Sequence, residues 1–336
     1  MNWYILACAI GIKDMKLFLQ DLMFSLSKGK PGGVCWLVLF GPQANSGASV
    51  YHWIIPSLPF TMQPLFHSPL KCNVAALHRC TNFISRKTKH IDAFLYWGHA
   101  NSWVLGGWKR EKPFMSLRQL IDTVLRRLAP PLVVFDACSM GSIACLYELQ
   151  HIPKIRLLVA SPGLQPYISF LSIKGFFNKE KNLKNKAVRM ANDWMQVAKR
   201  EGEADACMLT FDMHAIHKHR IVSDLKEVWK RMVFDKRAQM SREDARCFDV
   251  WSALRYFKPL QEKLRSTILN VLPSKSIPCL RSKGPSVDSQ VIRKWKEIYG
   301  KSRWAQYLGI QNQSHHKSLP QVCNCKSFKG LPTNLS

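Results

Sequence analysis

One histidine and one cysteine directly follow short apolar segments, and together these two residue types can perform nucleophilic catalysis. The apolar segment 94–98 leads to His99, and the segment 133–136 leads to Cys138, 39 residues further along the chain. A thiolate is a strong nucleophile, and a neighbouring imidazole can take the thiol proton and later protonate a leaving group. The pattern therefore predicts a cysteine nucleophile with a histidine general base.

Either residue alone is weak evidence for a site. A histidine near the end of a strand is more often structural or merely exposed, and a free cysteine is commonly a small buried apolar residue. The pair has small neighbours, because Ala100 follows His99 and Ala137 precedes Cys138. Small residues let backbone N–H groups approach a substrate closely. We expect the N–H groups of Ala100 and Cys138 to bind an oxyanion.

The segments around this pair predict a parallel α/β sheet. Candidate strands are short apolar runs closed by small or polar residues, at 2–11, 34–40, 50–55, 94–98, 133–136, 156–161 and 208–212. Candidate helices have apolar residues at helical spacing, at 14–26, 74–86, 115–127 (with Ser116 as N-cap) and 142–150. Such alternation places helices on both faces of the sheet. The carboxyl ends of parallel strands meet at one edge, which brings His99 and Cys138 together.

The composition is that of a globular chain large enough for one extensive core, with 336 residues of which 47% are hydrophobic. The 11 cysteines form no Cys-x-x-Cys pair, which argues against a disulfide framework and favours a reducing, intracellular compartment. Cytosol, nucleus and mitochondrion are not distinguished. Residues 2–11 could be a short signal peptide, but no positive charge precedes them, so we interpret them as a strand. No stretch reaches the roughly 18 apolar residues of a membrane span.

The chain is strongly basic, with 49 Lys and Arg against 22 Asp and Glu and a net charge of +27. Such a surface attracts polyanions, so nucleic acid is a candidate partner, although basicity alone specifies no site. The histidines at 214–219 and the His and Cys residues at 315–325 lack four ligands at a spacing that suits zinc. We therefore predict no metal site.

The residues around the pair resemble those of the clostripain family of cysteine peptidases, which are relatives of caspases, gingipains and legumains. In that family a hydrophobic strand ends in Trp-Asp-His-Gly-Gly-Gly-Trp, where this chain has Trp97-Gly-His99-Ala-Asn-Ser-Trp103. A second strand there leads into Phe-Asp-Ala-Cys-Leu-Met-Gly, where this chain has Phe135-Asp-Ala-Cys138-Ser-Met-Gly141. The resemblance covers residues 1–308, and the cysteine motif is its most specific part.

The resemblance implies a caspase-like three-layer α/β/α sandwich and an endopeptidase that hydrolyses peptide bonds, often after Arg or Lys. The substrate is then a protein or peptide, and no cofactor is required; calcium is implied by the family and not by this sequence. In the resemblance, Asp136 lies near the floor of the pocket for the residue before the scissile bond, where its carboxylate could bind a basic side chain. A structural acid hydrogen-bonded to backbone is the other interpretation of Asp136.

Three departures from the family pattern support a second function. Gly98 stands where the family has Asp, Ala100 where it has Gly, and Pro162-Gly163 where it has an acidic pair. The alternative is a catalytically weakened or inactive peptidase-fold protein that binds nucleic acid through its basic surface.

The expected organisation has four parts. Residues 1–173 form the catalytic core with the dyad, 174–190 an exposed basic connection, 191–310 the remainder of the peptidase domain, and 311–336 a disordered polar tail. Helices are expected at 221–233, 248–272 and 291–308, and a surface loop at 273–290. Lys179, Lys181 and Lys184 are candidate self-cleavage positions within the connection, and a solvated linker is the simpler interpretation.

Overall fold

The chain forms a mixed α/β structure around one large sheet. The computed structural model describes residues 1–8, 12–40, 47–56, 63–70, 73–101, 104–106, 115–163, 165–166, 168–178, 180, 182–203, 206–221, 224, 247–249, 258–270 and 281–283. Within these ranges, none of the helices is long and apolar enough to cross a membrane.

The central sheet has eight strands in the order β11-β10-β9-β5-β1-β2-β3-β4. They are β1 (Asn2–Cys8), β2 (Gly33–Phe40), β3 (Ala48–Ile55), β4 (Phe66–Ser68), β5 (Ala93–Gly98), β9 (Leu132–Asp136), β10 (Leu157–Ala160) and β11 (Leu209–Asp212). The five strands from β10 to β2 pair in parallel, while β3, β4 and β11 are antiparallel. The predicted, mostly parallel sheet is confirmed.

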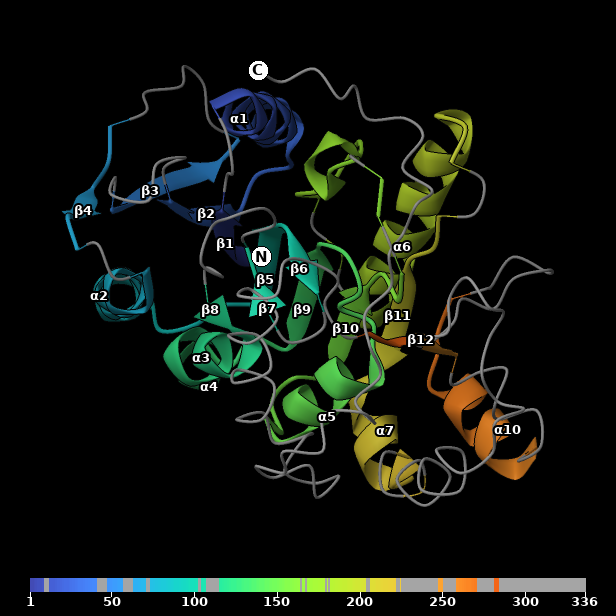
Figure 1. The fold of residues 1–336 in the computed structure, drawn as a ribbon. Helices are drawn as coiled ribbons and strands as arrows, with labels where there is room; N and C mark the ends of the chain where they lie inside the picture. The colour runs from blue at the N-terminus through green and yellow to red at the C-terminus, as the bar shows by residue number, and fades with distance from the viewer. Residues whose placement is uncertain are drawn as a thin grey trace, which may run out of the picture.

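Helices cover both faces of the sheet, as Figure 1 shows. On one face lie α1 (Ile12–Lys28) and α6 (Leu183–Arg200); on the other lie α2 (Asn73–Lys87), α3 (Leu117–Leu120), α5 (Ile143–Gln150) and α7 (Met213–Lys218). Strand β1 alternates between the two cores, because Trp3 and Ile5 pack on the α1 side and Tyr4 and Leu6 on the α2 side. Burial on both faces explains why its sequence is almost continuously apolar. The expected three-layer sandwich is confirmed.

The helix predicted at 115–127 is one continuous helical segment with a local change of winding. It consists of α3, a π-helical turn η1 (Ile121–Leu125) and α4 (Arg126–Leu128). The predicted cap is confirmed, because the Ser116 side chain accepts a hydrogen bond from the Gln119 N–H. The Gln119 side chain in turn accepts one from the Ser116 N–H, which completes a capping box.

Other segments differ from the sequence-based expectation. In the predicted helix 248–272 the structure has the end of β12 (Cys247–Asp249) and α10 (Lys258–Ser266), and in the predicted loop 273–290 it has β13 (Arg281–Lys283), paired with β12. The short strands β6 (Ala100–Asn101), β7 (Val104–Leu105) and β8 (Met115–Ser116) form a small separate sheet. The tail 311–336, the helix expected at 291–308 and most of that at 221–233 lie outside the described residues.

The basic segment 174–190 is not uniformly exposed. Phe176 and Phe177 are buried against Trp3, with the Trp3 and Phe176 ring centroids 4.5 Å apart. Helix α6 begins within the segment, at Leu183, and its amphipathic pattern buries Lys186. The many lysines of this segment predicted an exposed connection, but the two buried aromatic residues hold its first part against the sheet. Lys179 and Lys181 lie outside the described residues.

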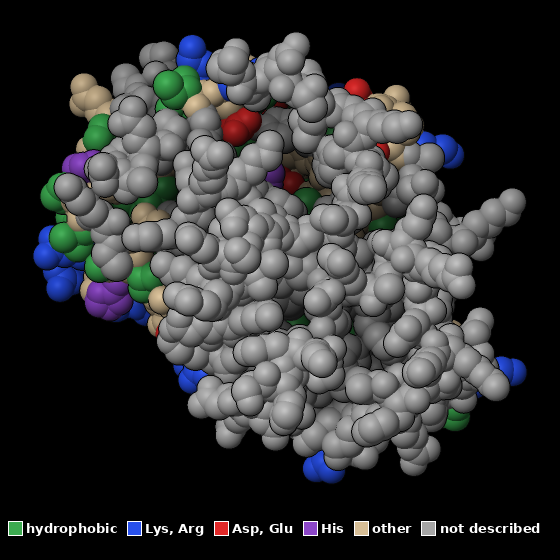
Figure 2. Space-filling view, viewed as in Figure 1, with side chains coloured by type: hydrophobic (Ala, Val, Ile, Leu, Met, Phe, Trp, Pro, Cys, Tyr) green, Lys and Arg blue, Asp and Glu red, His purple; other side chains and the backbone are tan. Residues whose placement is uncertain are grey.

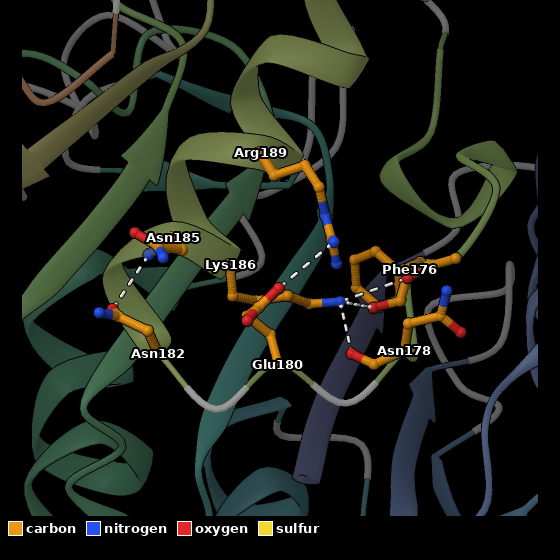
Figure 3. A network of polar contacts seen from close by, with 8 residues as sticks. Phe176, Asn178, Glu180, Asn182, Asn185, Lys186 and Arg189 are labelled. Atoms are coloured by element: carbon orange, nitrogen blue, oxygen red, sulfur yellow. Dashed lines mark hydrogen bonds and ion pairs between the residues drawn. The ribbon is translucent and has the colours of Figure 1, made fainter.

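Lys186 is buried because its ammonium group satisfies backbone carbonyls that precede α6. Its Nζ donates to the carbonyl oxygens of Gly175 at 3.3 Å and Asn178 at 3.1 Å, and also to that of Phe176 (Figure 3). Burial lowers the pKa of this ammonium to about 8, with the charge of Arg189 acting in the same direction. Three donors matched to three carbonyls offset the desolvation of the charge.

Replacing Lys186 by Met should lower the free energy of unfolding by about 1–3 kcal/mol, because the methionine fills the space but leaves the three carbonyls without their donor. Urea unfolding followed by circular dichroism measures the change. Lys184→Met is the matched control, since Lys184 is exposed on the same helix, and it should change the stability by less than about 0.5 kcal/mol. Equal stabilities of the two variants would contradict a stabilising role for Lys186.

Candidate active site

The register of two neighbouring parallel strands places His99 and Cys138 at the same level. Strands β5 and β9 pair directly, and Trp97 lies opposite Asp136. His99 and Cys138 each follow that pair by two residues, at the carboxyl edge of the sheet. Adjacent strands are separated by about 4.8 Å. The two predicted residues therefore follow the ends of adjacent parallel strands, on the same edge of the sheet.

Two hydrogen bonds to one oxygen anchor the backbone of His99. The Tyr96 hydroxyl donates to the His99 carbonyl oxygen at 2.8 Å, and the Gly106 N–H donates to it at 2.6 Å. Gly106 directly follows β7, and Ala100 begins β6 and pairs with Leu105. The small antiparallel sheet beyond β5 thus fixes the position from which the imidazole projects, and it buries Ala100.

Desolvation by the surrounding protein favours the neutral form of the His99 imidazole. The residue has solvent-exposed surface, yet the surrounding protein displaces much of the water around the ring, and this desolvation lowers its pKa below the usual value. The negative charge of Asp14 acts in the opposite direction and raises the pKa. A neutral imidazole at neutral pH is the form that can accept a proton.

The turn that carries Cys138 is fastened to the chain that follows β10. Ser139 adopts a left-handed conformation with φ of 59°, and its N–H donates to the Gly163 carbonyl oxygen at 2.7 Å. The Gly141 N–H donates to the Ser161 carbonyl oxygen at 2.8 Å. A side chain at position 141 would lie only 3.0 Å from the Pro162 nitrogen. The glycine of the cysteine motif is therefore required by the close approach of the neighbouring backbone.

The Cys138 thiol faces the backbone of Gln165, a contact that the sequence did not predict. The Gln165 N–H donates to Sγ at 3.3 Å, and the thiol donates to the Gln165 carbonyl oxygen at 3.9 Å. The backbone of Gln165 therefore fixes the position of the sulfur.

Cys138 also differs from the other described cysteines in its exposure. It is partly exposed, whereas Cys8, Cys35, Cys80, Cys145 and Cys207 are buried. Burial raises the pKa of each of those five thiols. Among the six cysteines whose side chains the structure describes, Cys138 alone combines access to solvent with a donor directed at its sulfur.

Asp136 is buried and holds the segment after β10 against the nucleophile strand. Its Oδ1 accepts a hydrogen bond from the Gln165 side-chain amide at 2.8 Å, and its Oδ2 accepts from the Ser169 hydroxyl at 3.1 Å and the Phe170 N–H at 2.9 Å. Burial raises the pKa of this carboxyl to about 7, although these three donors oppose the shift. The geometry corresponds to the structural interpretation of Asp136, with a partial negative charge near the site.

Two acidic residues of helix α1 influence the ionisation of groups at this edge of the sheet. Asp14 and Asp21 are seven residues apart and so share one helix face. Asp14 raises the pKa of His99, and Asp21 raises that of Asp136. In the face of the molecule drawn in Figure 2, acidic and histidine side chains lie close together in a recess in the upper part. Neither residue was predicted from the sequence, although their seven-residue spacing on an amphipathic helix indicated a shared face.

Asp21 has no basic partner among the described residues, unlike Asp122, Glu180 and Asp224. It is half-buried, burial raises its pKa, and none of the described residues forms an ion pair or hydrogen bond with it. Within the described ranges, no group of three or more His, Cys, Asp or Glu residues could hold a metal ion.

The backbone conformation at Gly98 and the lack of space around it account for the glycine at this position, where the resemblance places Asp. Its φ is +146°, and a Cβ atom would lie 2.9 Å from the Cys8 carbonyl oxygen and 3.0 Å from the Tyr96 hydroxyl. We expect Gly98→Ala to lower the free energy of unfolding by about 1–3 kcal/mol and to slow alkylation of Cys138 by displacing His99.

Gly202→Ala is the control for this substitution, because Gly202 also has a positive φ, of +85°, but nothing lies within 4 Å of its Cβ position. It should cost about 1 kcal/mol and leave the alkylation rate unchanged. Thermal unfolding and iodoacetamide labelling measure both effects. An unaltered alkylation rate in Gly98→Ala would show that the backbone contact does not position His99.

The fold is similar to that of solved cysteine proteases, whereas no protein-family model and no curated protein matches the sequence. An inactive zymogen C11 protease from Parabacteroides distasonis is similar with a TM-score of 0.62 and 11% identity, over 91% of this chain and 97% of that chain. A secreted C11 cysteine protease from Bacteroides thetaiotaomicron, in complex with an irreversible peptide inhibitor, is similar with a TM-score of 0.58 and 11% identity, over 90% and 99%. C11 is the clostripain family. At this identity the similarity establishes the caspase-like fold and no more.

Proposed function

We propose that this chain is a cysteine endopeptidase in which Cys138 is the nucleophile and His99 the general base. The observation that supports the proposal is the pairing of β5 with β9, because an imidazole whose pKa desolvation lowers and a partly exposed thiol each follow the ends of these adjacent strands by two residues. The fold it shares with C11 proteases supports the same assignment. Neither residue requires a metal or an organic cofactor for this chemistry.

In the proposed reaction, His99 takes the thiol proton and the Cys138 sulfur attacks the carbonyl carbon of the scissile peptide bond. The N–H groups of Ala100 and Cys138 stabilise the negative oxygen of the tetrahedral intermediate. When the C–N bond breaks, the imidazolium gives its proton to the leaving amine and a thioester remains. His99 then removes a proton from water, which attacks the thioester, and the carboxylic acid product leaves as the thiol is regenerated.

Cys138→Ala should abolish peptide cleavage with no loss of folded structure, because the partly exposed side chain contributes little to the core. Cleavage of a positional-scanning peptide library, read by mass spectrometry, is the measurement. Cys207→Ala is the control, since it removes a buried thiol far along the sequence from the dyad, and it should keep the cleavage pattern. A Cys138→Ala variant that still cleaves would refute the assignment.

The pH dependence of kcat/KM should follow the protonation state of His99. Because desolvation lowers the pKa of His99, the base form persists below pH 6.5, and kcat/KM should fall only when the pH drops below the usual histidine value. His99→Gln should remove the rapid reaction of Cys138 with a peptidyl electrophile. If kcat/KM instead fell on lowering the pH with a midpoint above pH 7, this would contradict the assignment of His99 as the base.

We further propose that the site prefers substrates with Arg or Lys before the scissile bond. The carboxylate of Asp21 lacks a protein partner among the described residues, and it lies close enough to Asp136 to raise the pKa of that group. A cationic side chain bound here would offset the repulsion between the two acids. Asp136 contributes charge and holds the segment at 165–170, while Asp21 has the free oxygens for a charge-assisted hydrogen bond.

Asp21→Asn tests this preference. It should lower kcat/KM for Arg and Lys substrates by about tenfold, which is the effect of losing one charged hydrogen bond, and should leave neutral substrates unchanged. Asp122→Asn is the control, because Asp122 is an exposed acid in η1. An equal loss for basic and neutral substrates would show that Asp21 does not select the basic side chain.

No observation on the described residues favours the nucleic-acid alternative beyond the net charge of +27. Basicity is a property of the whole surface and does not define a binding site. We therefore propose the peptidase activity alone.

A further inference from the structure

We propose that Asp14 is the positioning carboxylate of His99, which orients the imidazole and stabilises the imidazolium that forms when His99 takes the thiol proton. This inference rests on the proposed function. It replaces the two-residue dyad with a linear arrangement of carboxylate, imidazole and thiol, contributed by the start of α1 and the ends of β5 and β9.

The strand pairing brings the start of α1 to His99. Strand β1 pairs with β5 in parallel, and its last residue, Cys8, lies opposite Gly98. Helix α1 begins at Ile12, a few residues after Cys8, so its first turn lies at the same edge of the sheet as His99. Asp14 is in that first turn.

Packing along α1 fixes which face of the helix is turned to β5. The Phe18 ring is buried against Trp97, with ring centroids 4.6 Å apart. Asp14 lies four residues before Phe18 and so projects from the same face, one turn nearer the carboxyl edge. His99 lies two residues beyond Trp97 in the same direction. The contact between Phe18 and Trp97 therefore aligns the carboxylate with the imidazole.

The opposite end of the same helix face confirms its direction. Asp21 influences the ionisation of Asp136, and the Ser25 hydroxyl donates to the Leu171 carbonyl oxygen. Because α1 joins the carboxyl end of β1 to the start of the parallel strand β2, the face that bears Asp14, Phe18, Asp21 and Ser25 runs from the edge at His99 back over the sheet. Its orientation depends on several contacts and not on Asp14 alone.

The electrostatic effect of Asp14 has the sign that the role requires. Burial makes the protonated imidazole unfavourable, and Asp14 is the charged group that counteracts this effect. The titratable groups next to His99 on strands β1 and β5 are the Cys8 thiol and the Tyr96 hydroxyl. Burial raises the pKa of both Cys8 and Tyr96, so neither supplies negative charge at neutral pH. The carboxylate therefore favours transfer of the thiol proton to His99.

A purely structural role is the competing explanation, because an acidic residue in the first turn also stabilises a helix through its dipole. The two roles differ in what they do to His99. Loss of a dipole interaction lowers stability and leaves the ionisation of the imidazole unchanged. Loss of a positioning carboxylate lowers the imidazole pKa and slows proton transfer.

The test measures the pKa of His99 directly, by NMR titration of ¹⁵N-labelled histidine in the full-length chain carrying Cys138→Ala. His99→Gln in the same background identifies the resonance. Adding Asp14→Asn should lower the His99 pKa, whereas Asp14→Glu should keep it near the original value. Asp122→Asn should leave it unchanged. An unchanged His99 pKa in Asp14→Asn would overturn the proposal.

Kinetics on the chain with Cys138 intact give the second readout. Asp14→Asn should lower kcat/KM on its pH plateau by about tenfold and move the acidic limb to lower pH. A tenfold loss without movement of that limb would overturn the proposal in favour of the structural role. If the unsubstituted chain cleaves no peptide while Asp14→Asn still lowers the His99 pKa, the pairing is supported and the peptidase function is refuted.

Discussion

The register between β5 and its two neighbours is the constraint on which the rest of the site depends. Trp97 lies opposite Ala7 on one side and Asp136 on the other, and this alignment sets the level of the residues that follow. Because side chains alternate along a strand, a slip of one residue would turn every side chain to the other face. Both faces of β5 contact apolar cores, so the close packing of its large side chains against their neighbours opposes such a slip. The same alignment positions His99, Cys138 and the start of α1.

Hydrogen bonds from loops make this register into a defined site. The His99 carbonyl is held by Tyr96 and Gly106, and the cysteine turn is held by the chain after β10. Asp136 then holds that chain in place by accepting three hydrogen bonds from it. These contacts order the backbone on both sides of the thiol, so the side chains need little further ordering before reaction. The buried carboxylate therefore acts on the site mainly through the segment it binds.

Acidic residues collect at this edge of an otherwise strongly basic protein. Asp14 and Asp21 lie on one face of α1, and Asp136 lies beneath the cysteine turn. Desolvation raises the pKa of Asp21 and Asp136 and lowers that of His99. Burial thus moves the acids and the base toward neutral forms, and each then responds to the charge of its neighbours. A cation in the recess or a proton on His99 would relieve the unfavourable placement of these carboxylates.

The sequence by itself determined the central sheet, its flanking helices and the two candidate catalytic residues. Apolar runs closed by small residues are local patterns, and the order of strands and helices leaves few topologies for a parallel sheet. Only the tertiary structure decided which residues surround the pair. Gln165 contacts Cys138 from a distant segment, and Asp14 of α1 raises the pKa of His99 at the end of β5. No local pattern in the sequence encodes such long-range neighbours. The same reason explains Lys186, which reads as one more exposed lysine until the fold places three carbonyl oxygens around it.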